Sequence, residues 1–287
     1  MAVSFIDDSQ PVISVDTKKK ELLGNYANGG AEWTPIAEPE RVLVHDFADP
    51  ALGEYTKSIP YGIYDVAKNE GWVNVDDTAA TSEFAVESIR RWWHQMGRER
   101  FSHAERLLIT ADAGGSNGYR IRAWKVELAR LAQEIGMFIT VCHYPPGTSK
   151  WNRIEHRMFN FITMNWRGKP LTSVRTIIEL ISATSTTTRL TIEVDYDPNW
   201  YPKGVKISNA KLAAVPLEAH DFHGEWSYTN DGLSNALHEG LNRRVRLVIN
   251  RAYGFKFTNN LIALRLLDRS GHCPPLPGRQ LAKATHG

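Results

Sequence analysis

The chain has 287 residues, of which 42% are apolar and 23% charged, and its formal net charge at pH 7 is only +2. These values are ordinary for a globular protein and predict a hydrophobic core of normal size. The N-terminal residues MAVSFIDDSQ lack the basic-then-apolar pattern of a signal peptide, and no stretch approaches the ~18 apolar residues of a membrane span. The two cysteines share no metal-ligand spacing. We therefore expect a reduced, cytoplasmic protein with no membrane partner.

Charge is spread unevenly along the chain. From Asp231 to the end there are nine Lys/Arg and three Asp/Glu, which leaves 25 basic and 29 acidic residues before that point. The C-terminal segment thus carries a net +6 and the rest a net −4. A basic tail on a slightly acidic body suits contact with a polyanion, although many proteins that never touch nucleic acid share this feature.

Short β-rich runs alternate with helical runs in the first half of the chain. Alternating or wholly apolar runs predict strands at residues 12–15, 41–45, 61–66, 71–75 and 107–109. A helix is predicted to begin at Ser82 as its N-cap, and Trp92 and Trp93 on it are expected to pack in the core rather than to stack on bases. The strand at 107–109 runs into Asp112 and then into a glycine-rich turn at 114–118, which lacks the Gly-Lys-Ser/Thr ending of a P-loop.

Further along, helical spacing of apolar residues predicts helices at 120–135, 152–167 and 172–185, with a strand at 137–141. Three strands followed by strand and helix in alternation predict an α/β fold, a mixed sheet flanked by helices. After Thr191 several Asp, Pro and Asn residues predict an irregular segment. A basic amphipathic helix is predicted at 236–253, and the stretch from Gly271 onwards is expected to be disordered.

Three acidic residues stand out as candidate metal ligands. Asp16 and Asp112 each follow an apolar strand, so their side chains are expected at the carboxyl edge of the sheet, where α/β proteins place functional groups. Aspartate at a strand end is also a common turn or cap residue. Glu155 shares one face of its predicted helix with apolar residues, a face that reads Asn152, Glu155, Phe159, Ile162 and Trp166. A carboxylate on such a face needs a partner, either an inward arginine or a divalent metal shared with other carboxylates.

Taken together, these three carboxylates suit Mg²⁺, a hard cation that prefers oxygen ligands. Two such ions roughly 3.5–4 Å apart can support phosphodiester cleavage. Several polar side chains are candidate DNA contacts: Lys18, Lys19, Lys20, Lys150, Asn152, Arg153, Arg243 and Arg244. A solvated charged surface is the plainer interpretation of the lysine run. His45 and His156 are expected near the site, and Asp46 is a reserve candidate for the first metal ligand.

Several motifs resemble the Rhodopirellula-type transposases, the ISAzo-thirteen group of insertion sequences. They are ISVDTKKKE at 13–21, PYGIYD at 60–65, SIRRWW at 88–93, ITAD at 109–112 with its glycine-rich turn, PPGTSKWNRIEH at 145–156 and HGEW at 223–226. The resemblance covers roughly residues 12–229. The segment 145–155 also resembles the wider DDE superfamily pattern, in which a proline-rich loop precedes Asn-x-x-Glu at a helix start.

The resemblance implies a ribonuclease-H-like fold with a mixed five-stranded sheet, and a metal-binding triad of Asp16, Asp112 and Glu155 that holds Mg²⁺ or Mn²⁺, two ions in all. The implied chemistry is hydrolysis at the ends of a DNA element, followed by attack of the freed 3′-hydroxyl on target DNA. The expected partners are element ends and target DNA, with a homo-oligomer assembled on them at the bacterial nucleoid.

The expected organisation is a catalytic domain at 1–190, a family-specific irregular extension at 191–230 and a basic tail at 231–287. Family members usually carry an N-terminal region with DNA-binding helices, so a chain that opens close to the first catalytic strand is expected to be truncated. From Leu233 the sequence resembles instead the C-terminal end of the ISL-three transposases, which suggests a chimera. In that second family the residue matching Glu239 belongs to the active site, but here we expect Glu239 to be idle.

Three functions stay open at this point. The chain is an active DDE transposase core, a non-catalytic fragment that binds DNA or full-length transposase, or a metal-dependent nuclease without strand transfer. The presence of all three carboxylates favours a competent site.

Overall fold

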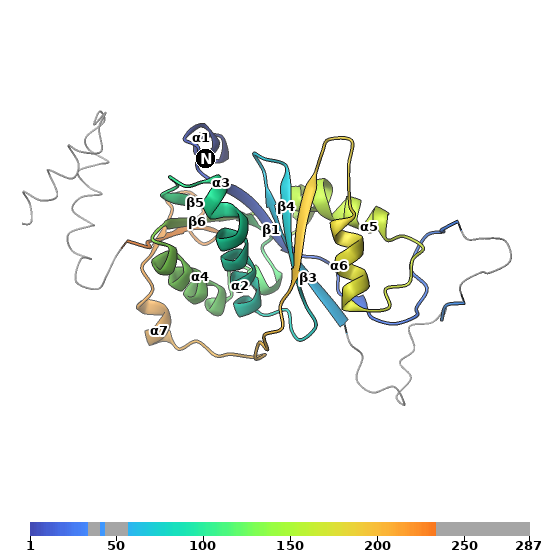
Figure 1. The fold of residues 1–287 in the computed structure, drawn as a ribbon. Coiled ribbons are helices and arrows are strands. Elements are labelled where there is room, and N and C mark those ends of the chain that lie inside the picture. The colour runs from blue at the N-terminus through green and yellow to red at the C-terminus, as the bar shows by residue number, and fades with distance from the viewer. Residues whose placement is uncertain (34–40, 44–56, 234–287) are drawn as a thin grey trace, which may run out of the picture. The chain divides into compact units, whose positions relative to one another are not determined.

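The computed structural model describes residues 1–33, 41–43 and 57–233, all within one compact unit, Met1–Leu233 (Figure 1). The predicted basic helix at 236–253, the tail from Gly271, and the candidates His45, Asp46, Glu239, Arg243 and Arg244 lie outside the described residues. None of the helices in the described ranges combines the length and the hydropathy that a bilayer span requires.

Five strands form the centre of the sheet, in the order β4-β3-β1-β5-β6. They are β1 (Val12–Thr17), β3 (Lys57–Asp65), β4 (Glu70–Asp76), β5 (Arg106–Ala111) and β6 (Phe138–His143). The first three pair antiparallel, whereas β5 runs parallel to β1 and β6 runs parallel to β5. This mixed five-stranded arrangement confirms the ribonuclease-H-like α/β fold that the sequence predicts.

Short strands extend both edges of this centre to nine strands in the described residues. β7 (Thr191–Tyr196) runs parallel to β4 at one edge, and β9 (Ser227–Asn230) followed by β8 (Leu217–Ala219) extends the β6 edge. β2 (Glu21–Leu22) pairs with the start of β3. The chain after Thr191, predicted to be irregular, therefore contributes regular strands at opposite edges of the sheet.

The predicted strand at 41–45 is described only as far as residue 43. Within that part it is a single isolated bridge between Leu43 and Tyr26 rather than a strand. The helix predicted to begin at Ser82 has Thr81 as its N-cap instead, because the Thr81 hydroxyl accepts the backbone N–H of Phe84 at 3.2 Å. Ser82 Oγ is engaged elsewhere, donating to the carbonyl of Ser116.

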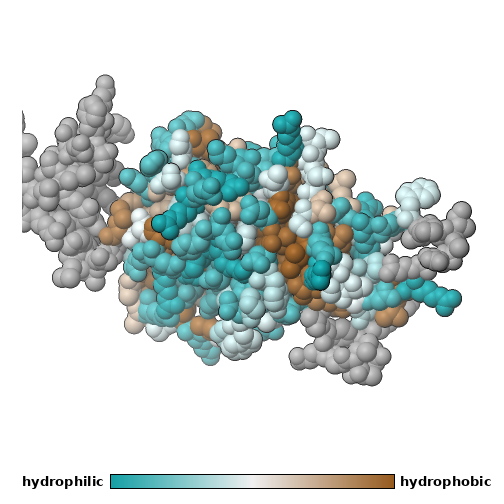
Figure 2. All heavy atoms as spheres, viewed as in Figure 1, coloured by the Kyte–Doolittle hydropathy of each residue, from teal (hydrophilic) through white to brown (hydrophobic). Residues whose placement is uncertain are grey.

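Helices cover both faces of the sheet (Figure 1). On one face α2 (Ser82–Trp92) and α4 (Arg122–Ile135) pack together over a core that includes Val15, Ile89, Trp92, Trp93 and Trp124. Burial of both Trp92 and Trp93 confirms that this pair packs in the core. On the other face α5 (Asn160–Asn165) and α6 (Val174–Ser182) bury Ile162 and Ile177 against Tyr64 and Val73. Hydrophilic side chains dominate the outer surface over α2 and α4 in Figure 2.

The remaining helical segments are short. They are α1 (Ala2–Asp7), the π-helical turn η2 (Trp93–Gly97), α3 (Arg98–Arg100), the 3-10 turns η3 (Gly115–Asn117) and η4 (Ser149–Trp151), the π-helical turn η5 (Glu155–Phe159) and α7 (Asn209–Ala213). η3 follows β5, whereas η4 and η5 follow β6 one after the other, so two stretches of chain that are distant in sequence meet at the carboxyl edge of the sheet.

Candidate metal and catalytic site

Two of the three predicted carboxylates come from neighbouring parallel strands. Asp16 is in β1 and Asp112 follows β5 directly, and the register pairs the preceding residues, Val15 with Ala111. Since parallel strands end at the same sheet edge, this register brings both side chains there. Both line one pocket of about 310 Å³, here called the carboxylate pocket, whose other walls are Ala113, Gly114, Gly115, Pro145, Gly147 and Ser149.

Asn152 holds the third segment against these strands. It is fully buried, and its amide nitrogen lies 3.4 Å from the carbonyl of Val15 and 3.5 Å from Asp16 Oδ2. Its amide oxygen accepts the hydroxyl of Ser14, whose oxygen in turn accepts the backbone N–H of Ile154 at 3.2 Å. These contacts fix the start of the helical segment that carries Glu155 to the middle of β1.

Glu155 is the first residue of the π-helical turn η5. The sequence predicts an ordinary α-helix there, and the buried positions Phe159, Ile162 and Trp166 confirm the apolar face. Apolar periodicity does not distinguish a single wide turn from an α-helical one, so sequence reasoning missed it. Such π-helical turns are frequent at functional sites.

Burial and mutual repulsion dominate the electrostatics of the site. Burial raises the pKa of Asp16 to about 7, with further increases from the charges of Asp112 and Glu155 and smaller decreases from hydrogen bonds. The pKa of Asp112 is also raised, by burial. Burial raises the pKa of Glu155 as well, against the opposing charge of Lys18. Each carboxyl group is therefore harder to ionise here than in water, because burial outweighs the compensating hydrogen bonds and charges.

These donors fit a divalent cation in their chemistry. Asp112 Oδ1 is buried and accepts no hydrogen bond from any described residue, and neither Asp16 nor Asp112 forms an ion pair within the described part of the chain. Buried carboxylate oxygens without partners are costly unless a cation or proton satisfies them. Hard cations such as Mg²⁺ bind such oxygens.

The positions of the three carboxylates, unlike their chemistry, do not match a formed metal site. Across residues 1–33, 41–43 and 57–233, no group of three or more His, Cys, Asp or Glu side chains lies close enough together to hold a metal ion. Coulomb repulsion among the three carboxylates opposes closer approach. Binding of one ion by all three carboxylates would require them to come closer together than they lie in this structure.

The predicted DNA contacts are split between surface and interior. Lys19, Lys20, Lys150 and Arg153 are exposed, as is His156, whose ring nitrogen lies against the carbonyl of Lys150. Lys18 is buried instead, with its ammonium 4.4 Å from the centre of the Trp166 ring and 3.5 Å from Glu21. Lys18 and Asn152 therefore act inside the protein, next to the carboxylates, and present little surface to a ligand in this conformation.

The strand order and the acidic pocket at the carboxyl edge define a ribonuclease-H-like α/β domain. The chain belongs to the family described as Rhodopirellula transposase DDE domain, whose family model matches residues 2–231. Because this match covers most of the chain, it confirms the family that the sequence motifs resemble.

Other similarities are local or weak. The chain is 48% identical over 48 residues to the transposases for insertion sequence element IS1557 from two strains of Mycobacterium tuberculosis, CDC 1551 / Oshkosh and ATCC 25618 / H37Rv. That match covers 17% of this chain and 11% of each relative's length. The resemblance of the segment from Leu233 to the ISL-three family stays a prediction.

Two solved structures of Mos1 transposase are also similar, the paired-end complex with left transposon end and the mariner paired end complex with Mn. Each of the two is 10% identical to this chain, and each match covers 58% of this chain. The matches cover 45% and 46% of the two Mos1 chains, with TM-scores of 0.39 and 0.37. TM-scores this low do not define a shared fold, which rests here on the strand order.

Proposed function

We propose that this chain is the catalytic core of a DNA transposase, in which Asp16, Asp112 and Glu155 hold divalent cations, Mg²⁺ or Mn²⁺, for strand cleavage and strand transfer at the ends of an insertion sequence. Family membership supports the class of protein. The observation that carries the enzymatic part is the unpartnered, buried Asp112 Oδ1 beside Asp16 in one pocket. Buried acids without partners reduce stability, so they are found mostly where a function requires them.

Other residues of this chain would support the three carboxylates. Asn152 orients Asp16 through its amide nitrogen and ties the Glu155 segment to β1. Lys18 offsets part of the charge of Glu155. A pair of divalent cations, when bound, supplies Lewis-acid stabilisation for in-line displacement at a phosphodiester. The exposed Lys19, Lys20, Lys150 and Arg153 would draw the DNA backbone towards the pocket.

A supercoiled-plasmid assay with Mg²⁺ or Mn²⁺ tests this proposal. We expect nicked plasmid from the wild-type chain and none from Asp112→Ala. Asp221→Ala removes an exposed aspartate from the same chain and should nick like the wild type, so it controls for the change in net charge. Nicking that survives Asp112→Ala would remove Asp112 from the catalytic site.

The products separate the remaining alternatives. Joined DNA strands in the same assay would support transposase chemistry, whereas nicks alone with supplied element ends would indicate a metal-dependent nuclease. Binding of DNA without nicking in either metal would overturn the enzymatic proposal in favour of a non-catalytic fragment that binds DNA or intact transposase.

A further inference from the structure

A second hollow, of about 450 Å³, lies beside the carboxylate pocket and takes no part in the proposed chemistry. The two hollows share Ala113, Gly114, Gly115 and Gly147. The second, here called the tyrosine pocket, is completed by Gly118, Tyr119, Arg120, Ile121 and Pro146. A DNA strand that lies in the carboxylate pocket would therefore pass along a shared wall into this second hollow.

Three of the four shared residues are glycines, so few side chains separate the two pockets. A Cβ atom added at Gly114 or Gly147 would meet no other atom within 4 Å, so both backbones face open space. Gly147 also has a φ of +81°, which side-chain-bearing residues rarely adopt. A ligand can thus approach the main chain of both loops closely, and a volume of about 450 Å³ lies within the range of small-ligand sites.

Tyr119 and Arg120 supply a planar, cationic wall. The guanidinium carbon of Arg120 lies 5.1 Å from the centre of the Tyr119 ring. The ring is also in edge contact with His143 and Trp226, at centroid distances of 6.1 and 6.4 Å, so its orientation is fixed by packing. Arg120 is exposed and forms no ion pair with any described residue, which leaves its charge available.

We propose that the tyrosine pocket takes the base of an unpaired nucleotide next to the strand position at the carboxylates. This inference rests on the proposed function, because the neighbouring pocket must hold a DNA strand. Aromatic and guanidinium planes stack on bases whatever their sequence. Arg120 adds a charge that attracts the adjoining phosphate. The glycine wall lets the strand cross from one pocket to the other without a clash.

Fluorescence anisotropy of the full chain with labelled DNA tests this, in EDTA so that cleavage plays no part. Three probes are compared: a blunt duplex, the same duplex with a short single-stranded 3′ tail, and the tailed duplex with abasic sites in the tail. We expect the tail to tighten binding about tenfold, as stacking of one base does. The abasic tail should bind like the blunt duplex.

Variants place the effect at the pocket. Tyr119→Leu and Arg120→Ala should each remove most of the tail preference, whereas Tyr119→Phe keeps the ring and should retain it. Arg130→Ala removes the same charge from the far part of α4, where Arg130 pairs with Glu127 at 2.6 Å, and should leave the tail preference unchanged. Equal binding of the abasic and normal tails, or a tail preference that survives Tyr119→Leu, would overturn the proposal.

Failure here differs from failure of the proposed function. If the chain nicks plasmid but binds tailed and blunt DNA equally, only the proposal for the tyrosine pocket fails. If the chain prefers tailed DNA in a way that depends on Tyr119 but never nicks plasmid, the proposal for the tyrosine pocket stands and the enzymatic proposal fails.

Discussion

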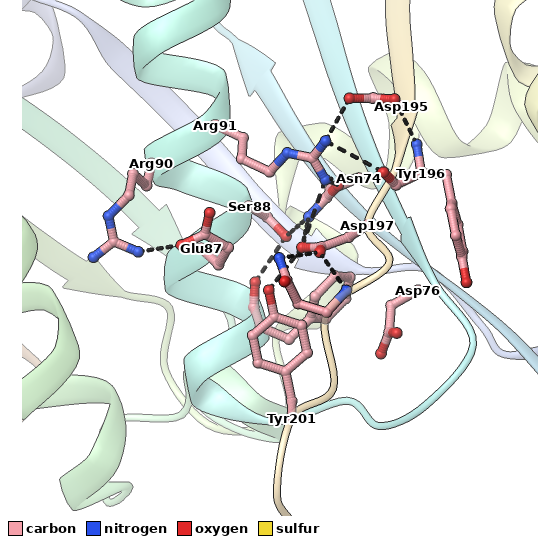
Figure 3. A network of polar contacts seen from close by, with 12 residues as sticks. Asn74, Asp76, Glu87, Ser88, Arg90, Arg91, Asp195, Tyr196, Asp197 and Tyr201 are labelled. Atoms are coloured by element: carbon pink, nitrogen blue, oxygen red, sulfur yellow. Dashed lines mark hydrogen bonds and ion pairs between the residues drawn. The ribbon is translucent and has the colours of Figure 1, made fainter.

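Asp16 lies in the central strand β1 and Asp197 follows the edge strand β7 of the same sheet, and their surroundings have opposite effects on their pKa values. Asp197 follows β7 and is fully buried among donors (Figure 3). Its Oδ2 accepts the hydroxyl of Tyr201 at 2.7 Å and the amide of Asn74 at 3.1 Å, and lies 3.6 Å from the guanidinium of Arg91. Burial alone would raise the pKa of Asp197, but these contacts, together with hydrogen bonds from Asn199 to Oδ1, hold it below its usual value.

Asp16 has no comparable set of donors. It accepts the backbone N–H of Thr17 at 2.7 Å and a long contact from Asn152, and the charges of Asp112 and Glu155 raise its pKa further. Its pKa is accordingly raised to about 7, with burial as the largest cause. The neighbouring Asp112 keeps one buried oxygen without a partner.

The difference separates a structural carboxylate from a candidate functional one. The carboxylate of Asp197 interacts with Arg91 of α2 and accepts the hydroxyl of Tyr201. These contacts hold β7 and the chain after it against α2. The carboxylate pocket leaves Asp16 and Asp112 without an ion pair in the described residues, an arrangement that costs stability and is typical of functional sites. Mutations in the two regions should therefore shift stability in opposite directions.

The largest effect is expected for Asp197→Ala. Removing this carboxylate leaves Tyr201, Asn74 and part of Arg91 without their buried partner, and breaking such a pair costs about 3–5 kcal/mol. Urea unfolding followed by circular dichroism measures the loss. Asp195→Ala is the matched control, because Asp195 also pairs with Arg91 but is half exposed, so its loss should cost less than about 1 kcal/mol. Equal losses in both variants would contradict a network centred on Asp197.

Asp16→Asn should stabilise the fold by about 2–3 kcal/mol at pH 8 in the absence of divalent metal. The native carboxyl keeps its proton up to about pH 7, whereas the unfolded one releases it near its ordinary value of 3.8. Wild-type stability should therefore fall as pH rises from about 4 to 7 through this group, a loss that the amide variant avoids. Unfolding midpoints in EDTA at pH 5 and pH 8 measure the difference, which should be less than half as large at pH 5 as at pH 8. A destabilised variant at pH 8 would show that Asp16 is already neutralised in the protein.

Tyr201→Phe should cost about 1.5 kcal/mol, the low end for a hydrogen bond to a charged group. The phenyl ring keeps the packing against Phe84, whose centroid lies 5.5 Å away, so the change isolates the hydroxyl. Loss of this donor should also raise the pKa of Asp197, and acid unfolding should begin at a higher pH than in the wild type. An unchanged acid transition would mean that the remaining partners, Asn74, Asn199 and Arg91, suffice to hold Asp197 ionised.

The central sheet was predictable because its strands carry strong local signals. The wholly apolar run 107–109 and the β-rich runs 61–66 and 71–75 became β5, β3 and β4. β7 was missed although Ile192, Val194 and Tyr196 alternate with polar residues, since the Asp and Pro residues that follow favoured an irregular interpretation. Its pairing with β4 depends on distant sequence, which no local pattern reports.

The candidate site was predictable only in part. Strand ends and helix spacing are local features, and they pointed to Asp16, Asp112 and Glu155. The unpartnered oxygen of Asp112 and the burial of Lys18 against Trp166 arise from tertiary packing and leave no trace in the spacing of residues. Asn152 was placed on the buried helix face by its spacing, but its bond to Ser14 joins segments that lie more than a hundred residues apart.

Addition of Mg²⁺ or Mn²⁺ should stabilise the wild-type chain at pH 8 by about 1.4 kcal/mol when the metal is at ten times its dissociation constant. The cation would neutralise carboxylates that repel one another, so stabilisation should shrink as pH falls below about 7, where protons compete for Asp16. Asp112→Asn should abolish the metal-dependent shift in melting temperature, whereas Tyr201→Phe should lower the melting temperature but leave that shift intact. If Asp112→Asn responded to metal like the wild type, the cation would bind elsewhere. The contrast between Asp197 and Asp16 would then reflect packing rather than function.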